Sequence, residues 1–286
     1  MKYFKILSPL AIVLSLGLSQ LSLRSEATET QKPAAKPATK PVKIELPFDA
    51  AKDGLCFSNW GFADVAWPLG KIADKAGACQ GMSGIVAATH RYVSFDPDGP
   101  KMSDSGILDR IQEAVNLYSQ GCNDVTCKKG VIKVTGYASL REACKVSTQA
   151  LKSLSVYNNA SIAQYDILPL LPQFLHPEDN DEKWSKHNLA TLRSIYADLK
   201  QGRPALLLYV SHVVTVYGIE EVQDASGKLT AIKLKIWNPN ANQYTGEEEV
   251  DILNGNTAAP GWHIWDLTPG SPAARARSQA IPGIFF

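Results

Sequence analysis

The order of its secondary-structure signals is the feature that most constrains this chain. Four segments carry apolar residues at helical spacing: residues 79–92, 104–120, 139–157 and 184–200. The segment 131–137 alternates and predicts one short strand. Apolar or alternating segments then predict a run of further strands: residues 205–210, 212–219, 229–237, 248–253 and 262–267. Because most helices precede most strands, the sequence predicts an α+β fold with an antiparallel sheet.

The N-terminus has the pattern of an export signal. Two lysines begin an apolar run over residues 6–23, and the small residues Ser25 and Ala27 follow it. We therefore expect a secretory signal peptide over residues 1–27, and a mature chain that is secreted or held in the periplasm or cell envelope. An uncleaved anchor is the alternative, although proline and serine interrupt the run. No later apolar stretch has membrane length, so we expect no span after signal removal.

Composition separates a tether from a single domain. Residues 28–43 are dominated by Pro, Ala, Lys and Thr, which predicts an extended or disordered linker. Residues 44–286 then form one domain of ordinary soluble composition, since the chain is 45% hydrophobic and 20% charged. The net charge of +1 gives no electrostatic reason to expect nucleic acid as a partner.

Five cysteines bear on both redox state and chemistry. In an exported chain, Cys122 and Cys127 can close a small loop, and Cys56 and Cys144 can form a long-range disulfide, which leaves Cys79 unpaired. The other pairings of these four, or five free thiols, remain open. One Cys-x4-Cys pair without a nearby second pair or His cluster is a poor zinc ligand set, so we expect no metal.

Cys79 lies in the segment Gly77-Ala78-Cys79-Gln80-Gly81-Met82, at the start of a predicted helix. The free N–H groups and the dipole at a helix N-terminus favour negative charge, so we expect a lowered thiol pKa. The small neighbouring residues would let a substrate carbonyl approach the sulfur. The simpler alternative is a buried structural cysteine, since free cysteine is among the most buried residue types.

Two further residues complete a candidate catalytic set. His212 opens an apolar strand, and Asn238 ends the next strand, where Pro239 stops the pairing. Adjacent antiparallel strands would bring the two side by side, so that the amide oxygen of Asn238 could orient the imidazole. The alternatives are a core or edge histidine and a turn-forming Asn-Pro pair.

A helix-start cysteine followed by a strand-start histidine and then an asparagine resembles papain-like cysteine peptidases. More narrowly, the chain resembles bacterial members with a Cys-x-Gly-Met turn, a His-x-Val…Tyr-Gly strand and a following Asn/Asp-Pro-Asn segment. Here these are Cys79-Gln80-Gly81-Met82, the strand over residues 212–218 and Asn238-Pro239-Asn240. The resemblance implies a papain-like fold, with N-terminal helices packed on a C-terminal antiparallel sheet. It also implies a thiol hydrolase that cleaves peptide or related amide bonds of a peptide or protein substrate, without a cofactor.

The oxyanion donor departs from the family pattern. Papain-like enzymes place a side-chain amide, usually Gln, a few residues before the cysteine, but residues 71–78 contain no Asn or Gln. The resemblance implies that Asn59 supplies this donor, with the intervening segment as an insertion. Gln80 is the other candidate. A missing donor would typically slow such a reaction by ~10²–10³.

Other readings of the sequence remain open. The chain could be a catalytically inactive papain-like domain that binds a ligand or protein in the cell envelope. The same three residue types also fit transfer to an amine, as in transglutaminases, and a zinc hydrolase is a third alternative. Among the remaining polar residues, His90 is too far along its helix to act as the base for Cys79. His263 is more typical of a packed strand position, and Asp266 is an alternative to Asn238.

Overall fold

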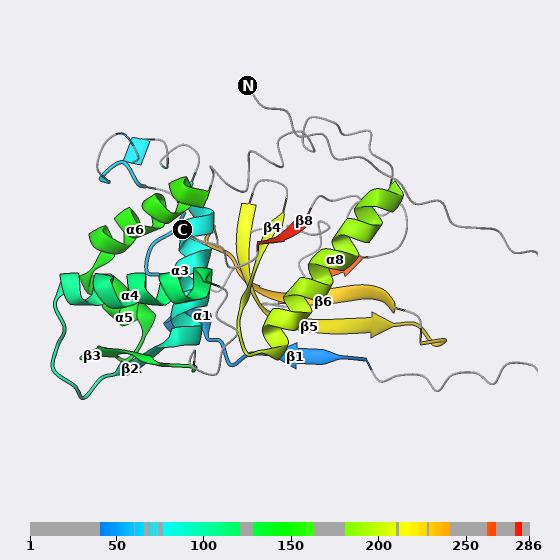
Figure 1. The fold of residues 1–286 in the computed structure, drawn as a ribbon, viewed down its shortest axis with the longest axis horizontal. Coiled ribbons are helices and arrows are strands. Elements are labelled where there is room, and N and C mark those ends of the chain that lie inside the picture. Colours follow the sequence, from blue (N-terminus) through cyan, green and yellow to red (C-terminus); the bar gives the residue numbers. More distant parts are fainter. Residues whose placement is uncertain are drawn as a thin grey trace, which may run out of the picture. The chain divides into compact units, whose positions relative to one another are not determined.

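The framework of the molecule is an antiparallel sheet with the strand order β7-β6-β5-β4-β8 (Figure 1). Its strands are β4 (Ala205–Tyr209), β5 (His212–Gln223), β6 (Leu229–Trp237), β7 (Trp262–Asp266) and β8 (Ser278–Ile281). β5 is the longest strand and holds the sheet together. Its first half pairs with β4, and its second half pairs on the same edge with β1 (Lys43–Glu45). β6 borders β5 along the other edge.

The computed structural model describes these residues: 41–59, 61–65, 68, 70–71, 73, 77–120, 128–162, 181–209, 212–227, 229–240, 262–266 and 278–281. For some of them it describes the backbone alone: residues 159–162, 181–190, 209, 212, 230, 262–266 and 278–281. All of them belong to one compact unit, Ala38–Phe286. The predicted signal peptide, most of the linker and the predicted strand 248–253 lie outside the described residues.

Three of the described helices begin after a residue whose side chain caps them. The described helices are α1 (Ala50–Asp53), α3 (Cys79–Tyr92), α4 (Asp104–Ser119), α5 (Leu140–Val146), α6 (Thr148–Ile162) and α8 (Asp181–Lys200). The side chains of Asp49, Ser103 and Ser139 each accept a backbone N–H in the first turn of α1, α4 and α5. In the part of the chain that is described, no helix is long and apolar enough to cross a membrane.

The mixture of helices and an antiparallel sheet confirms the predicted α+β class. α3 and β6 have the predicted bounds, and α4, α8, β3 (Ile132–Thr135), β4 and β7 differ from prediction only at their ends. The predicted helix 139–157 is wrong as a single element. Its backbone leaves the helical region at Ser147 (φ −106°, ψ 30°), which separates α5 from α6.

Three of the described strands were not predicted. β2 (Val93–Asp96) follows α3 directly and pairs in parallel with β3, forming a separate small sheet. β8 lies near the C-terminus and pairs with β4. β1 begins at the last residue of the predicted linker. The backbone N–H of Glu221 donates to the Val42 carbonyl oxygen at 2.9 Å, and the Val42 N–H donates to Oε2 of the Glu221 side chain at 3.0 Å, so the fold starts slightly earlier than predicted. Short strands of three or four residues carry too few positions for a periodic signal.

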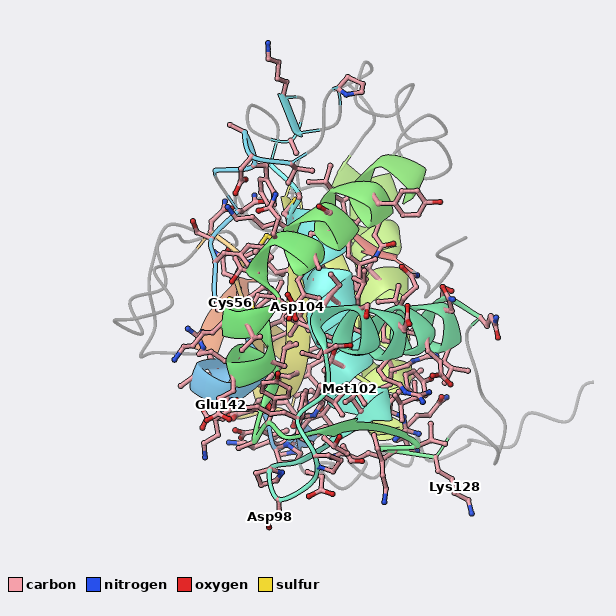
Figure 2. All side chains as sticks on the ribbon, turned by 90° about the vertical axis from the view of Figure 1, so that its left-hand side faces the viewer. Cys56, Asp98, Met102, Asp104, Lys128 and Glu142 are labelled. Carbon is pink, nitrogen blue, oxygen red and sulfur yellow. A yellow bond between two sulfur atoms is a disulfide. The ribbon has the colours of Figure 1, made fainter. Side chains whose placement is uncertain are left out.

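α3 is the central helix of the domain. All residues from Cys79 to Thr89 are buried, and the helix contacts α4 and α6 on one side and β4 and β5 on the other (Figure 1). A helix that is buried on every side is typical of a protein core. The side-chain view in Figure 2 shows α4 and α6 lying over α3 from the helical side of the domain.

Gly81 sets the distance between α3 and α6. A Cβ atom at Gly81 would lie 1.9 Å from the backbone oxygen of Ser155 in α6, which is a severe clash. Glycine is therefore required here because two backbones pack against each other. The sequence predicts that the small residues beside Cys79 leave room for a substrate, but at Gly81 the backbone of α6 fills this space.

A buried ion pair fixes the end of α8. Arg203 donates from Nε to Oδ1 of Asp198 at 3.1 Å, and from Nη2 to the same oxygen. Burial raises the pKa of Asp198, and the hydrogen bonds from Arg203 oppose this rise. The hydroxyl of Tyr118, at the end of α4, donates to the Pro204 carbonyl oxygen at 2.6 Å. These contacts join the helices to the start of β4.

We predict that Gly81→Ala lowers the free energy of unfolding by about 1–3 kcal/mol or more, because the added methyl separates α3 from α6. Urea denaturation monitored by circular dichroism measures the change. Gly106→Ala in α4 is the matched control, since a Cβ there meets side chains alone: the flexible Met102 at 2.8 Å and the Ser103 hydroxyl at 3.4 Å. The control should be neutral or slightly stabilising, because alanine favours helix by ~1 kcal/mol over glycine. Equal effects of the two substitutions would contradict this role of Gly81.

Candidate active site

The turn before Cys79 is shaped by two residues without capping groups. Gly77 has φ +77°, a conformation that favours glycine, and Ala78 is the N-cap of α3. Ala78 makes no side-chain hydrogen bond to the first turn. Cys79 is therefore the first residue of α3, and no side chain of the N-cap covers the N–H groups around it.

The sulfur of Cys79 is buried and held by backbone donors. Cys79 is 9% exposed and is the free cysteine of the described residues. Backbone N–H groups of Val213, Gln80 and Cys79 itself hydrogen-bond to the thiol sulfur. Burial nevertheless raises the pKa of the Cys79 thiol, and these three donors only reduce the rise. The lowered pKa expected from the helix N-terminus alone is therefore wrong in direction for this environment.

The contact with Val213 brings β5 to the sulfur. β5 begins at His212, which pairs with Tyr209 across the β4–β5 connection. Because the N–H of Val213 belongs to the peptide bond that follows His212, the sulfur lies beside that peptide bond. The imidazole of His212 is not among the described side chains, so its contact with the sulfur stays a prediction.

Two further hydrogen bonds fasten α3 to β5 one turn beyond Cys79. The Ser83 hydroxyl donates to the Val213 carbonyl oxygen at 3.0 Å, and the Thr215 hydroxyl donates to the Ser83 carbonyl oxygen at 3.0 Å. Ser83 and Thr215 are fully buried. The backbone of Val213 thus contacts α3 through both its N–H and its C=O. Sequence analysis missed Ser83 and Thr215, although polar residues within apolar segments are the available signal.

Asn238 follows β6 directly and is 2% exposed. Trp237 pairs with Thr215, and the two strands are antiparallel, so the step from Trp237 to Asn238 leads toward the His212 end of β5. The predicted adjacency of these two strands is thus observed. Oδ1 of Asn238 accepts the backbone N–H of Asn240 at 2.9 Å, which forms the Asx turn expected of an Asn-Pro segment. The contact predicted between Asn238 and the imidazole of His212 stays a prediction, because the His212 side chain is not described.

Asn59 lies directly against the turn that precedes Cys79. It is 3% exposed, and its Oδ1 accepts the Ala78 N–H at 2.5 Å. A Cβ at Gly77 would lie 2.5 Å from Nδ2 of Asn59, so only glycine leaves room for this side chain. The residue predicted as oxyanion donor is therefore next to the candidate nucleophile in space, although twenty positions separate them in sequence.

Asn59 also reaches the segment after β6. Its Nδ2 donates to Oδ1 of Asn240 at 2.8 Å, and its backbone N–H donates to the Pro239 carbonyl oxygen at 3.0 Å. Nδ2 carries two hydrogens, and Asn240 uses one of them. Asn59 therefore joins the turn before Cys79 to the segment that holds Asn238. Asn240 is a second residue that sequence analysis did not single out as part of this network.

The other candidates are distributed as follows. Gln80 is 6% exposed and is the second residue of α3. His90 lies eleven residues beyond Cys79, which is ~16 Å along a helix axis, too far for direct proton transfer.

His263 pairs with Leu234 and Asp266 with Ala231 at the sheet edge, but the side chains of β7 are not described. Within the described ranges, no three His, Cys, Asp or Glu side chains form a possible metal site.

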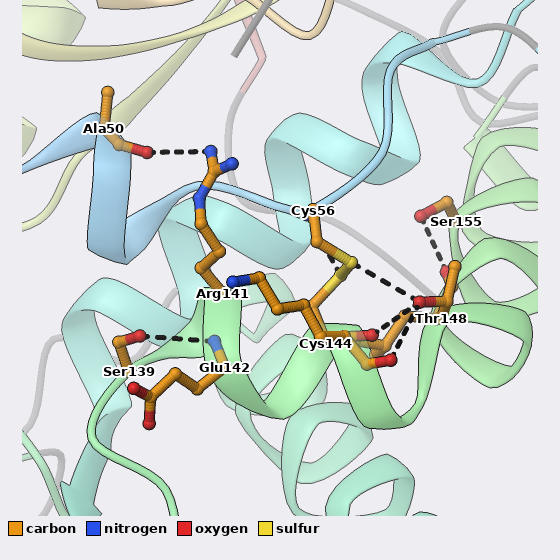
Figure 3. The surroundings of a disulfide bond; sticks show 10 residues. Ala50, Cys56, Ser139, Arg141, Glu142, Cys144, Thr148 and Ser155 are labelled. Atoms are coloured by element: carbon orange, nitrogen blue, oxygen red, sulfur yellow. Dashed lines mark hydrogen bonds between the residues drawn. A yellow bond between two sulfur atoms is a disulfide. The ribbon is translucent and has the colours of Figure 1, made fainter. Parts of the chain in front are cut away.

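A disulfide holds the segment that carries Asn59. Cys56 and Cys144 are bonded, with their Cα atoms 5.7 Å apart, and the bond joins the segment before Asn59 to α5 (Figure 3). The Cys56 N–H donates to the Cys144 sulfur at 3.0 Å, and the Thr148 hydroxyl donates to the Cys144 carbonyl oxygen at 2.8 Å. This pairing is one of those considered from the sequence. Cys122 and Cys127 lie outside the described residues.

Arg141 supports the same region from α5. Its Nη2 donates to the carbonyl oxygen of Ala50 in α1 at 3.1 Å, as Figure 3 shows beside the disulfide. Trp237 approaches the same place, because a Cβ at Gly54 would meet both its indole nitrogen and the Ala50 carbonyl oxygen at 2.7 Å. α1, α5 and the end of β6 therefore meet near the start of the segment that leads to Asn59.

Comparison with known proteins gives no relative for this chain: no protein-family model, no curated protein and no solved structure matches it.

We predict that replacing both bridge cysteines, Cys56→Ala with Cys144→Ala, lowers the free energy of unfolding by roughly 2–5 kcal/mol, because the bond closes a loop across 88 positions of sequence. Chemical denaturation under non-reducing conditions measures the loss. Cys79→Ala is the matched control, since it removes a buried sulfur without opening a bridge. An equal loss in the control would contradict a specific contribution of the disulfide.

We predict that Asn59→Ala costs about 1–3 kcal/mol, because it leaves the buried N–H of Ala78 without its acceptor. Urea denaturation gives the magnitude. Asn240→Ala removes the partner of Nδ2 but keeps the bond to Ala78, and should therefore cost less. If Asn240→Ala is as damaging as Asn59→Ala, then the bond to Ala78 is not the important one.

Proposed function

We propose that this protein is an exported papain-like thiol hydrolase in which Cys79 is the nucleophile, His212 is the general base and Asn238 orients that base. One observation carries the proposal: the Cys79 sulfur accepts a hydrogen bond from the N–H of Val213, the residue after His212. A sulfur at the start of a helix and beside the first peptide bond of a strand is where a strand-start histidine could reach it.

The proposed reaction is acyl transfer from an amide to water. His212 accepts the thiol proton while the sulfur attacks the carbonyl carbon, and the C–N bond then breaks as His212 returns that proton to the leaving amine. Water attacks the resulting thioester and gives a proton to His212, and a carboxylic acid and the free thiol are released. The remaining Nδ2 hydrogen of Asn59 is the proposed donor to the oxyanion. Peptides or proteins are the proposed substrates.

The raised pKa of Cys79 makes the histidine essential to this proposal. A thiol made harder to ionise by burial gives little thiolate at neutral pH unless a base removes its proton or an imidazolium stabilises the anion. The imidazole of His212 is the group that would supply the missing stabilisation.

The disulfide supports the proposed location outside the cytoplasm. Structural disulfides persist in oxidising compartments, and the Cys56–Cys144 bond lies in the folded part of a chain that starts with a signal-like segment. Secretion, or retention in the periplasm or cell envelope, is therefore the proposed destination.

The second candidate is a catalytically inactive domain with the same fold, which binds a ligand or protein in the cell envelope. Two observations favour it. Burial raises the pKa of Cys79, and both polar ends of the Asn59 side chain make hydrogen bonds within the protein. A domain of this kind would keep the Cys79 environment as part of its core.

The alkylation rate of Cys79 as a function of pH distinguishes the two candidates. We predict that iodoacetamide labels Cys79 at about pH 5.5, and that His212→Ala slows this labelling about tenfold or more, because the imidazolium no longer stabilises the thiolate. In the variant the rate should rise only at alkaline pH, since burial raises the thiol pKa. Mass spectrometry locates the adduct. His187→Ala, which replaces a histidine of α8 far in sequence from Cys79, serves as the histidine control.

Identical pH profiles for the wild-type protein and His212→Ala would overturn the hydrolase proposal in favour of the inactive domain. A peptide-library digest provides the second measurement. Cleavage products that are absent with Cys79→Ala would support hydrolysis, whereas products that persist in that variant would assign the cleavage to another site.

A further inference from the structure

The start of β5 extends beyond the end of β6. The pairing of β6 with β5 reaches Trp237, which lies opposite Thr215. Continuing this antiparallel register by two residues places Pro239 opposite Val213. Proline has no N–H to donate, and the Pro239 carbonyl oxygen accepts the Asn59 N–H at 3.0 Å. The backbone of Val213 therefore needs partners that β6 does not provide.

Helix α3 supplies these partners. The Ser83 hydroxyl donates to the Val213 carbonyl oxygen at 3.0 Å, and the Val213 N–H donates to the Cys79 sulfur. Cys79 and Ser83 are four residues apart in α3, so their side chains project from the same face of the helix on successive turns. The two side chains therefore take the place of a neighbouring strand at this one residue of β5.

Ser83 is itself held by β5. The Thr215 hydroxyl donates to the Ser83 carbonyl oxygen at 3.0 Å. Both residues are fully buried, and neighbours of theirs along the chain, Met82, Val214 and Val216, are buried and apolar. Apolar packing has no directional requirement, whereas a buried hydroxyl that loses its hydrogen bond costs free energy. The two hydroxyls therefore favour one alignment of α3 against β5.

We propose that Ser83 is a positioning residue for Cys79. By holding the Val213 carbonyl oxygen, Ser83 keeps the N–H of the same residue on the sulfur and keeps the preceding residue, His212, at the start of α3. Thr215 supports this role by holding the Ser83 carbonyl oxygen. The part of the inference that concerns His212 rests on the proposed function, and the part that concerns the Val213 N–H does not.

The pH dependence of Cys79 alkylation by iodoacetamide tests this role. Burial raises the Cys79 pKa, and the Val213 N–H is one of the three donors that oppose the rise. Ser83→Ala releases the Val213 carbonyl oxygen, so the N–H should move away from the sulfur. We expect the midpoint of labelling to shift to higher pH and the rate at acid pH to fall about tenfold. A change that only loosened the core would instead expose the sulfur and raise the limiting rate at alkaline pH.

Ser155→Ala is the matched control. Ser155 is also fully buried, but its hydroxyl donates to the Leu151 carbonyl oxygen at 2.8 Å, within α6. Its replacement should leave the midpoint unchanged. Circular dichroism verifies that each variant is folded. Equal midpoints for Ser83→Ala, Ser155→Ala and the wild-type protein would overturn the role assigned to Ser83.

Thr215 provides a second test, which also decides the matter if Ser83→Ala does not fold. Thr215→Val keeps the β-branched shape and loses the hydroxyl, whereas Thr215→Ser keeps the hydroxyl. We expect the midpoint to rise in Thr215→Val and to stay near the wild-type value in Thr215→Ser. Equal midpoints in these two variants would show that the hydrogen bond to Ser83 does not position the sulfur.

Repeating the Ser83→Ala measurement in the His212→Ala protein separates this inference from the proposed function. The Val213 N–H acts on the sulfur with or without the imidazole, so the shift should persist. If His212→Ala alone has no effect while the Ser83→Ala shift persists, the hydrolase proposal fails and the role of Ser83 stands. An effect of His212→Ala without any effect of Ser83→Ala would reverse that conclusion.

Discussion

The attachment of α3 to β5 is the interaction on which the rest of the structure depends. Val213 receives the Ser83 hydroxyl at its carbonyl oxygen and gives its N–H to the Cys79 sulfur, while Thr215 binds the Ser83 backbone. These contacts are buried, so water does not compete with them and their geometry is well defined. They determine how close the helix start can come to the start of the strand. The chemistry proposed for Cys79 and His212 requires this proximity.

The sequence predicts the long elements well because each carries many periodic positions. α3 and β6 are correctly bounded, since Gly77 precedes α3, Gly227 and Pro239 flank β6, and apolar residues repeat through both elements. The single helix predicted over α5 and α6 shows the limit of this signal. Apolar spacing continues across Ser147, but the backbone there leaves the helical region. Short β1, β2 and β8 depend on partners distant in sequence, which local patterns do not reveal.

The sequence predicts which residues make up the candidate site, but it does not predict the hydrogen bonds that connect them. The order of Cys79, His212 and Asn238 follows from spacing and resemblance. The bond from Asn59 to Ala78 could not be inferred, because it depends on a positive φ at Gly77 and on the absence of a side chain there. The thiol pKa was also misjudged, because the helix N-terminus is visible in sequence whereas burial is a tertiary property.

The bond between Asn59 and Asn240 has a consequence for the order in which the protein matures. It joins residues 181 positions apart. Closing so large a loop costs conformational entropy and slows folding. The bond is therefore expected to form only after the intervening elements have folded. A partly synthesised or partly folded chain therefore has the cysteine of α3 but lacks the assembled surroundings of that cysteine. The surroundings of that cysteine are therefore complete only after the chain has been made as far as Asn240 and β5 and β6 have formed.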